Sequence, residues 1–225
     1  MLCTAYGPPD SLTLTDVPSA PLGEHDLRIG VHAAGVNFPD LLIIQGLYQV
    51  KPDLPFAPGG EAAGGVLEVG PSVTDFTVGD RVLGMTRWNG FAEEAVVPAH
   101  RCVRVPAAVD LTVAAGISLT YGTCIHALVQ RARLQPGETL LVHGAAGGIG
   151  TATIDIGQCL GARIIATGGS DTKLRAVGRH YGVGALINYN TDAEWKDQVK
   201  ALTEGRGADV ICDPVGGDVF EKSLR

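Results

Sequence analysis

The sequence predicts an α/β protein in which an antiparallel β region precedes a doubly wound parallel sheet. Two observations predict this fold class. Up to about residue 110, short β-like runs alternate with glycine and proline turns. After residue 137, strands alternate with helices, a rhythm typical of a parallel sheet that helices cover on both faces. We therefore expect two domains, at residues 1–118 and 119–225.

The first region contains turn sequences, and the runs between them favour strands. Turns are expected at G-P-P (7–9), P-L-G (21–23) and V-G-D (78–80). The expected strands cover residues 12–17, 26–33, 65–69, 81–85, 91–97 and 102–105. Asp110 is expected to cap a helical region over 113–133 that breaks near 118–121.

The second region reads as a series of βα units. It begins with a strand over 139–143 and a helix over 148–160. The elements expected after them are a strand at 163–167, a helix at 173–181, a strand at 185–188, a helix capped by Thr191 or Asp192 and ending at 203, a strand at 209–212 and a helix at 216–224.

A cluster of glycines lies where the first strand of the second region passes into its helix. The segment from Gly144 to Gly150 reads G-A-A-G-G-I-G and contains the pattern A-x-G-x-x-G. Backbone N–H groups at a helix N-terminus can face a pyrophosphate there, and any Cβ would hold it off. The strand before this pattern and the βα unit after it strengthen the prediction. The alternative is a tight turn that packs closely and binds no ligand.

The end of the second strand indicates which dinucleotide would bind. NAD sites usually carry an acid there, which holds the ribose 2′-hydroxyl, but Gly168 occupies that place. Ser170 can donate a hydrogen bond, and Lys173 offers a point charge that suits a phosphate. These residues favour NADPH. Asp171 argues the other way because its charge is only slightly displaced, and Lys173 by itself could be a solvated lysine.

Composition and charge exclude several classes of protein. A net charge of −7 argues against broad binding of nucleic acid or anionic membranes, which needs concentrated Lys and Arg. No apolar run is long enough to span a membrane, and the N-terminus does not resemble a signal peptide. The five cysteines are scattered without a C-x-x-C pair, so we expect a reducing, cytoplasmic compartment.

Ordered motifs run along the whole chain. They are A-A-G-V-N-F-P-D at 33–40, G-L-Y at 46–48, P-F-A-P-G-G-E-A-A-G at 55–64, V-G-D-R-V at 78–82, L-T-Y-G-T at 119–123, the glycine cluster, I-N-Y at 187–189 and D-P-V-G-G at 213–217. Together they resemble the zinc-free quinone oxidoreductase branch of the medium-chain dehydrogenase/reductase superfamily, which includes zeta-crystallin. The resemblance implies a GroES-like β domain, then a Rossmann domain, with the active site in the cleft between them and a homodimer as the full-length form.

The resemblance also implies roles for single residues. Asn37 and Tyr48 would line the substrate and nicotinamide pocket, and either could hydrogen-bond the substrate oxygen that becomes anionic. The implied cofactor contacts are Thr120 from the interdomain segment, Gly147, Gly148 and Ile149 at the pyrophosphate, Gly169, Ser170, Lys173 and Tyr189 around the 2′-phosphate, and Val215 and Gly216 at the nicotinamide ribose. Without the resemblance, Asn37 could be a turn former, Tyr48 a half-buried loop aromatic, and Tyr189 a strand-end tyrosine.

The ligands of a catalytic zinc are missing from the sequence. Zinc-dependent relatives place Cys at the position of Asn37 and His at the position of Gly60, and their cysteine-rich structural-zinc lobe has no counterpart here. A catalytic zinc needs three protein ligands and an open position. We therefore expect zinc-independent chemistry, and we interpret His143 as a structural residue rather than an acid.

The expected activity is transfer of hydride from NADPH to a quinone. Two alternatives stay open: a reductase of α,β-unsaturated carbonyl or enoyl-CoA substrates, which needs similar geometry, and a non-catalytic protein that binds nucleotide or a partner. A complete dinucleotide fold of this type has six strands in the order 3-2-1-4-5-6, whereas we count four. We therefore expect the second domain to be C-terminally truncated.

Overall fold

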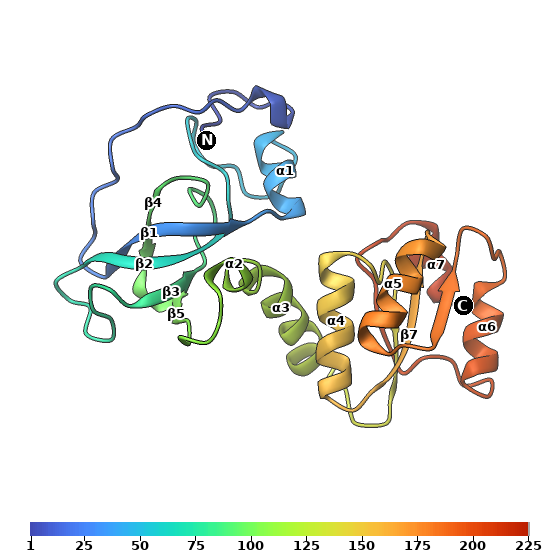
Figure 1. The fold of residues 1–225 in the computed structure, drawn as a ribbon. Helices are drawn as coiled ribbons and strands as arrows, with labels where there is room; N and C mark the ends of the chain where they lie inside the picture. The colour runs from blue at the N-terminus through green and yellow to red at the C-terminus, as the bar shows by residue number, and fades with distance from the viewer. Residues whose placement is uncertain (225) are drawn as a thin grey trace. The chain divides into compact units, whose positions relative to one another are not determined.

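The computed structural model describes residues 1–224, and the chain divides into two compact units, Met1–Leu119 and Thr120–Arg225 (Figure 1). An antiparallel sheet lies in the first unit and a parallel sheet in the second. The expected fold class is therefore confirmed. Within the described part of the chain, every helix is too short or too polar to cross a lipid bilayer.

The first unit is built on a five-stranded antiparallel sheet with the strand order β4-β1-β2-β3-β5. Its strands are β1 (Asp26–Gly35), β2 (Glu61–Val69), β3 (Arg81–Gly84), β4 (Glu94–Pro98) and β5 (Cys102–Arg104). The short helix η1 (Pro9–Ser11) precedes β1, and η2 (Ala99–Arg101) connects β4 to β5. Apolar side chains from all five strands, including Leu27, Val66, Val82, Val97 and Cys102, form one buried cluster. This cluster fixes the sheet because each of these strands presents apolar residues to it.

The strand expected at 12–17 does not form. Only Thr13 pairs there, as an isolated bridge to Leu2. Leu14 and Val17 are 87% and 57% exposed, whereas Leu12 packs against the buried cluster that contains Phe56, so most of this run has no core to face. The prediction was wrong because β-like composition needs a neighbouring surface that covers it.

A helix that the sequence patterns did not indicate, α1 (Phe38–Ile44), follows β1. Asn37 is its N-cap residue, and the Asn37 backbone N–H donates to the carboxylate of Asp40 at 2.8 Å. Ile43 and Ile44 at its end pack in a buried cluster with Cys3 and Phe56. The helix has only seven residues, too few to display a clear 3.6-residue period.

The segment between the sheets is helical but breaks earlier than expected. It contains α2 (Leu111–Ala114), α3 (Ser118–Ile125) and the π-helix η3 (His126–Arg131). The break therefore lies before residue 118 and not at 118–121. Asp110 caps α2, since its Oδ1 accepts from the Thr112 N–H at 2.7 Å, which confirms the predicted cap.

The second unit contains a four-stranded parallel sheet with the order β8-β7-β6-β9. The strands are β6 (Thr139–Val142), β7 (Arg163–Gly168), β8 (Ala185–Asn188) and β9 (Val210–Cys212). If the strands are numbered 1 to 4 along the chain from β6 to β9, their order across the sheet is 3-2-1-4. This is the first part of the 3-2-1-4-5-6 order of a doubly wound dinucleotide fold. Parallel neighbours place the carboxyl ends of β6 and β7 side by side, which is where the predicted site lies.

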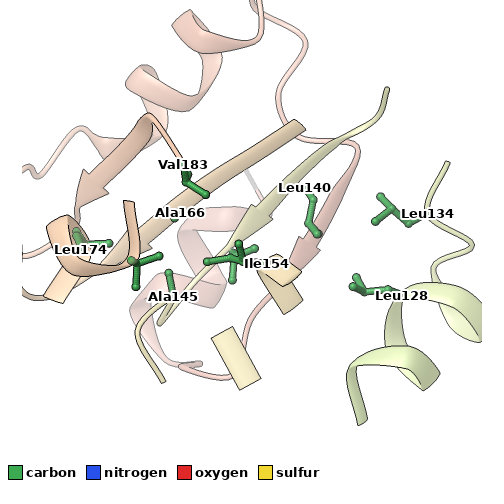
Figure 2. Close-up of a cluster of buried hydrophobic side chains, with 10 residues drawn as sticks. Leu128, Leu134, Leu140, Ala145, Ile154, Ala166, Leu174 and Val183 are labelled. Carbon is green, nitrogen blue, oxygen red and sulfur yellow. The ribbon is translucent and has the colours of Figure 1, made fainter. Parts of the chain in front are cut away.

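Helices cover both faces of this sheet. They are α4 (Gly148–Cys159), α5 (Asp171–Tyr181), α6 (Trp195–Leu202) and α7 (Asp218–Ser223). Leu140 and Val142 pack in one cluster with Ile154 and Leu174 of α4 and α5 (Figure 2). Leu141, between them in the strand, packs instead with Trp195 of α6. Alternate residues of β6 therefore face opposite layers, as a buried parallel strand requires.

Three helix starts differ from the sequence prediction. Helix α5 begins at Asp171 rather than 173, directly after its N-cap residue Ser170. Helix α6 begins at Trp195 with Glu194 as N-cap, so neither Thr191 nor Asp192 caps it; Asp192 instead accepts from the Glu194 N–H at 2.9 Å. The last helix begins at Asp218 rather than 216, because the two preceding glycines have positive φ angles of 72° and 59°, which no right-handed helix accommodates.

Candidate functional site

The glycine-rich turn after β6 leads directly into the N-terminus of α4. Gly144 has a φ angle of 58°, and its carbonyl accepts from the Gly147 N–H at 2.9 Å. Gly147 is the N-cap residue of α4. The N–H groups of the first helical turn lack partners within the helix, so they can bind an anion. The turn therefore has the geometry that the sequence predicted.

A cavity of about 360 Å³ opens beside this turn. The turn after β6, the end of β7, the start of α5 and Tyr189 after β8 surround it. The lining residues are Gly144, Ala146, Gly147, Gly168, Gly169, Ser170, Lys173, Leu174 and Tyr189. The structure thus brings together one predicted pyrophosphate contact, Gly147, and the four residues predicted around a 2′-phosphate. Four of the nine lining residues are glycines, so few side-chain atoms fill the cavity there.

The other predicted cofactor contacts of this unit lie near the turn but do not line the cavity. A Cβ at Gly148 would lie 3.2 Å from Thr120 Cγ2, so Thr120 packs against the start of α4. A Cβ at Gly144 would lie 2.9 Å from Val215 Cγ2. The Gly216 N–H donates to Asp213 at 3.0 Å, in the loop after β9.

Ile149, the remaining predicted contact, has its carbonyl in a hydrogen bond from the Cys124 thiol at 3.4 Å. It therefore anchors α4 to the preceding helix through its backbone. Thr120 and Val215 thus lie against the start of α4 and the turn, and Ile149 anchors α4 itself.

Lys173 is the positive charge of the cavity. It is exposed, and within residues 1–224 it forms no salt bridge with an acidic side chain. The nearby Asp171 does not line the cavity; its Oδ1 accepts from Asn188 Nδ2 at 2.6 Å. Tyr189 is half-buried, and burial raises the pKa of its hydroxyl, with a smaller contribution from the charge of Asp213. Among the residues that the structure describes, the cavity therefore offers the unpaired cation of Lys173 and neutral hydrogen-bonding groups.

His143, directly before the glycine turn, connects the end of β6 to β7 and α7. It is fully buried, and its Nδ1 and Nε2 lie 2.7 Å from Thr167 Oγ1 and 3.0 Å from Ser223 Oγ. Ser223 donates its own proton to the Val219 carbonyl, so Nε2 is the donor and Nδ1 the acceptor. Burial lowers the pKa of the imidazole, opposed by the charge of Asp213. His143 is thus a neutral structural residue, as the sequence indicated.

In the first unit, Asn37 is held by the buried carboxylate of Glu61, which lies in the P-F-A-P-G-G-E-A-A-G motif but had no predicted role. Asn37 Nδ2 donates to Glu61 Oε1 at 2.8 Å. Glu61 is 0% exposed, and its Oε2 accepts from the Ser118 hydroxyl at 2.6 Å and from the Leu119 N–H at 2.9 Å. All three partners donate, so Glu61 joins Asn37 to the start of α3. One Asn37 amide hydrogen is thereby committed to Glu61.

A second buried carboxylate, that of Asp40, binds the backbone of Asn37. Its oxygens accept from the backbone N–H groups of Asn37 at 2.8 Å and Gly59 at 3.2 Å. Burial raises the pKa of Asp40, and backbone hydrogen bonds oppose that rise. The backbone and the side chain of Asn37 are therefore held by two different acids.

Tyr48 lies in the first unit too, half-buried against the cluster of Ile43, Ile44 and Phe56. Among the residues that the structure describes, its hydroxyl has no hydrogen-bond partner, and Asn37 and Tyr48 share no hydrogen bond. In the same residues, no group of three or more His, Cys, Asp or Glu side chains is placed to hold a metal ion. Of Asn37 and Tyr48, Tyr48 is therefore the residue whose hydroxyl is free to donate a hydrogen bond to a ligand.

Comparisons with known proteins match both units. The family model described as "Alcohol dehydrogenase GroES-like domain" matches residues 23–107, and the one described as "Zinc-binding dehydrogenase" matches residues 148–225. Quinone oxidoreductase-like protein 2 from Mus musculus is 44% identical over 226 residues, which cover 100% of this chain and 63% of the mouse protein. The chain spans 61% to 63% of the length of the first curated relatives it matches.

Solved structures agree with these matches. The Escherichia coli quinone oxidoreductase complexed with NADPH is 31% identical with a TM-score of 0.90, covering 99% of this chain and 68% of that one. The enoyl reductase CurK is 29% identical with a TM-score of 0.90, covering 98% of this chain and 68% of the reductase. The backbone of this chain is therefore similar to that of reductases acting on more than one substrate class.

Proposed function

Because this chain belongs to the quinone oxidoreductase branch of the medium-chain dehydrogenase/reductase superfamily, we propose that it is an NADPH-dependent quinone oxidoreductase. The observation that carries the proposal is the cavity beside the glycine turn. There, Lys173 is unpaired among the described residues, and the neighbouring carboxylate of Asp171 is bound to Asn188. A cation without a competing acid suits a 2′-phosphate.

The chain's residues fit this cofactor. Gly144, Gly147, Gly168 and Gly169 line the cavity, and a Cβ at Gly147, the N-cap of α4, would meet only the Gly144 carbonyl oxygen at 3.4 Å. The residues proposed to hold NADPH are Thr120, Gly147, Gly148, Ile149, Gly169, Ser170, Lys173, Tyr189, Val215 and Gly216. When bound, NADPH supplies the hydride for reduction of the substrate.

In the first unit, Asn37 and Tyr48 are the proposed substrate residues. Tyr48 can donate its hydroxyl proton to a hydrogen bond with a substrate oxygen that gains negative charge. Asn37 is held by Glu61 and Asp40, so it presents its remaining amide hydrogen or its Oδ1 in a fixed orientation. Residues held in this way need little reorganisation when charge develops in the transition state.

Replacing Lys173 with alanine is expected to weaken NADPH binding by about ten- to a hundredfold, since a hydrogen bond between charged groups contributes about 1.5–3 kcal/mol. NADH binding should change little, because NADH lacks the 2′-phosphate. Titration of both cofactors by isothermal calorimetry measures this difference. Arg175→Ala is the matched control: Arg175 is an exposed cation of the same helix that does not line the cavity. Equal losses for NADPH and NADH in Lys173→Ala would remove the 2′-phosphate assignment.

The activity itself is tested by following NADPH oxidation with a quinone and, in parallel, with an enoyl thioester. Turnover with the quinone alone supports the proposal. Turnover with the thioester alone supports the second candidate, a reductase of α,β-unsaturated carbonyl or enoyl-CoA substrates, which the similarity to CurK favours. NADPH binding with no turnover of either substrate would identify a nucleotide-binding protein without this catalysis.

Several finer expectations stay predictions. They are the domain division between residues 118 and 119, zinc-independent chemistry, the homodimer of the full-length form and the cytoplasmic location. The absence of Cys at 37 and of His at 60 supports the expectation about zinc.

A further inference from the structure

We propose that Asn188 is a specificity-determining residue: its amide holds the carboxylate of Asp171 away from the ribose 2′ position, so that the cavity selects a 2′-phosphate. This inference rests on the proposed NADPH function, and in it Asn188 acts by positioning Asp171 rather than by contacting the cofactor. Asn188 Nδ2 donates to Asp171 Oδ1 at 2.6 Å.

The strand register places the two residues at the rim of the cavity. Asn188 is the last residue of β8 and lies opposite Gly168, the last residue of β7, which lines the cavity. Asp171 is the first residue of α5, between the lining residues Ser170 and Lys173. A hydrogen bond across this rim therefore controls where the Asp171 charge points.

Asp171 is the acid best placed to change cofactor choice. It is the one acidic residue between positions 163 and 181, the segment that forms β7 and α5. A free carboxylate at the end of this strand would accept from a ribose 2′-hydroxyl and repel a 2′-phosphate. Bound to Asn188, the carboxylate has a donor already and lies outside the cavity lining.

The Asn188 amide is fixed in the orientation that this role requires. Its Oδ1 accepts from the Asn190 N–H at 3.0 Å, while its Nδ2 donates to Asp171. A rotation of the amide by half a turn would place Oδ1 against the carboxylate and Nδ2 against the N–H, losing both hydrogen bonds. Asn190 in turn donates from Nδ2 to the Gly169 carbonyl at 3.2 Å, which ties the turn to the cavity.

The test is a double-mutant cycle read as the ratio of the NADH to the NADPH dissociation constant. Asn188→Ala is expected to lower this ratio roughly three- to tenfold, the effect of a like charge released near a phosphate at the surface. In an Asp171→Asn background the same substitution should leave the ratio unchanged, because no charge remains to be released. The second unit's fold is checked by circular dichroism for each variant.

Asn190→Ala is the matched control, since it alters the same turn but keeps the pair of Asn188 and Asp171. It should leave the ratio unchanged. The inference is overturned if Asn188→Ala shifts the ratio equally with and without Asp171, or does not shift it. It is also overturned if Asp171→Asn alone weakens NADH selectively, because Asp171 would then hold the ribose. If Lys173→Ala still lowers the ratio in those cases, the NADPH proposal stands without this inference; a wild-type chain that binds neither cofactor overturns both.

Discussion

Replacing Glu61 with alanine is expected to destabilise the first unit by about 3–5 kcal/mol, because three donors lose their acceptor and each orphaned donor costs about 1–3 kcal/mol when buried. Those donors are the Asn37 amide, the Ser118 hydroxyl and the Leu119 N–H. Glu61 is fully buried, whereas Asn37, Ser118 and Leu119 are half-buried, which keeps the loss toward the lower end of the sum over three donors. The substitution also leaves a cavity where the carboxylate stood.

The chain's two tryptophans allow each unit to be followed separately. Trp88 packs in the first unit and Trp195 in the second. In a Trp195→Phe background, urea unfolding followed by fluorescence should show the Glu61→Ala loss in the Trp88 transition. Ser118→Ala removes one donor and leaves the carboxylate with two, so it should cost about 1 kcal/mol. If Glu61→Ala and Ser118→Ala lower the free energy of unfolding by similar amounts, the hydrogen bonds to Asn37 and Leu119 add little to stability.

Glu61→Gln separates the network's effect on Asn37 from its effect on stability. Gln keeps the size of Glu but has one acceptor oxygen, and its NH₂ group donates where the second carboxylate oxygen of Glu61 accepted. The loss should be about 1–3 kcal/mol, less than for alanine. If the Gln amide faces Asn37, the Asn37 amide must rotate, and it would present a different group outward.

Most of the fold and half of the site followed from local patterns in the sequence. The strands and helices of the second unit, their order and the glycine turn are encoded in short stretches where apolar residues and glycines recur. The cavity residues Ser170 and Lys173 follow the second strand directly, so strand prediction was enough to place them.

What the sequence did not indicate depends on contacts between distant residues. Glu61 acquires its role from partners 24 and 57 positions away, and no local pattern encodes that pairing. Asn188 and Asp171 are 17 positions apart and meet only because β8 pairs beside β7. The helix start at 195 was misplaced for a related reason: Asp192 uses its carboxylate in a turn ahead of the helix, as short acids often do.

Replacing Gly150 with alanine is expected to destabilise the second unit by about 3 kcal/mol, at the upper end of overpacking effects. A Cβ there would lie 2.4 Å from the Gly144 carbonyl oxygen and 2.6 Å from Ala145 Cα. Both are backbone atoms, so no side chain can move aside. Alanine's advantage over glycine in a helix, about 0.5–1 kcal/mol, cannot offset this clash. The loss should appear in the Trp195 transition of a Trp88→Phe background, and NADPH binding should be lost with it.

Gly147→Ala is the matched control, because it adds the same methyl group to the same turn without the clash. Its Cβ would meet only the Gly144 carbonyl oxygen, at 3.4 Å, and its φ of −84° suits alanine. Stability should therefore change by about 1 kcal/mol or less, the usual effect of alanine at an N-cap. The methyl group enters the cavity, however, and would separate a diphosphate from the helix N-terminus, so NADPH affinity should fall at least about tenfold. A folded Gly147→Ala chain that binds NADPH like the wild type would show that the diphosphate lies elsewhere, and the proposed oxidoreductase would lose its cofactor site.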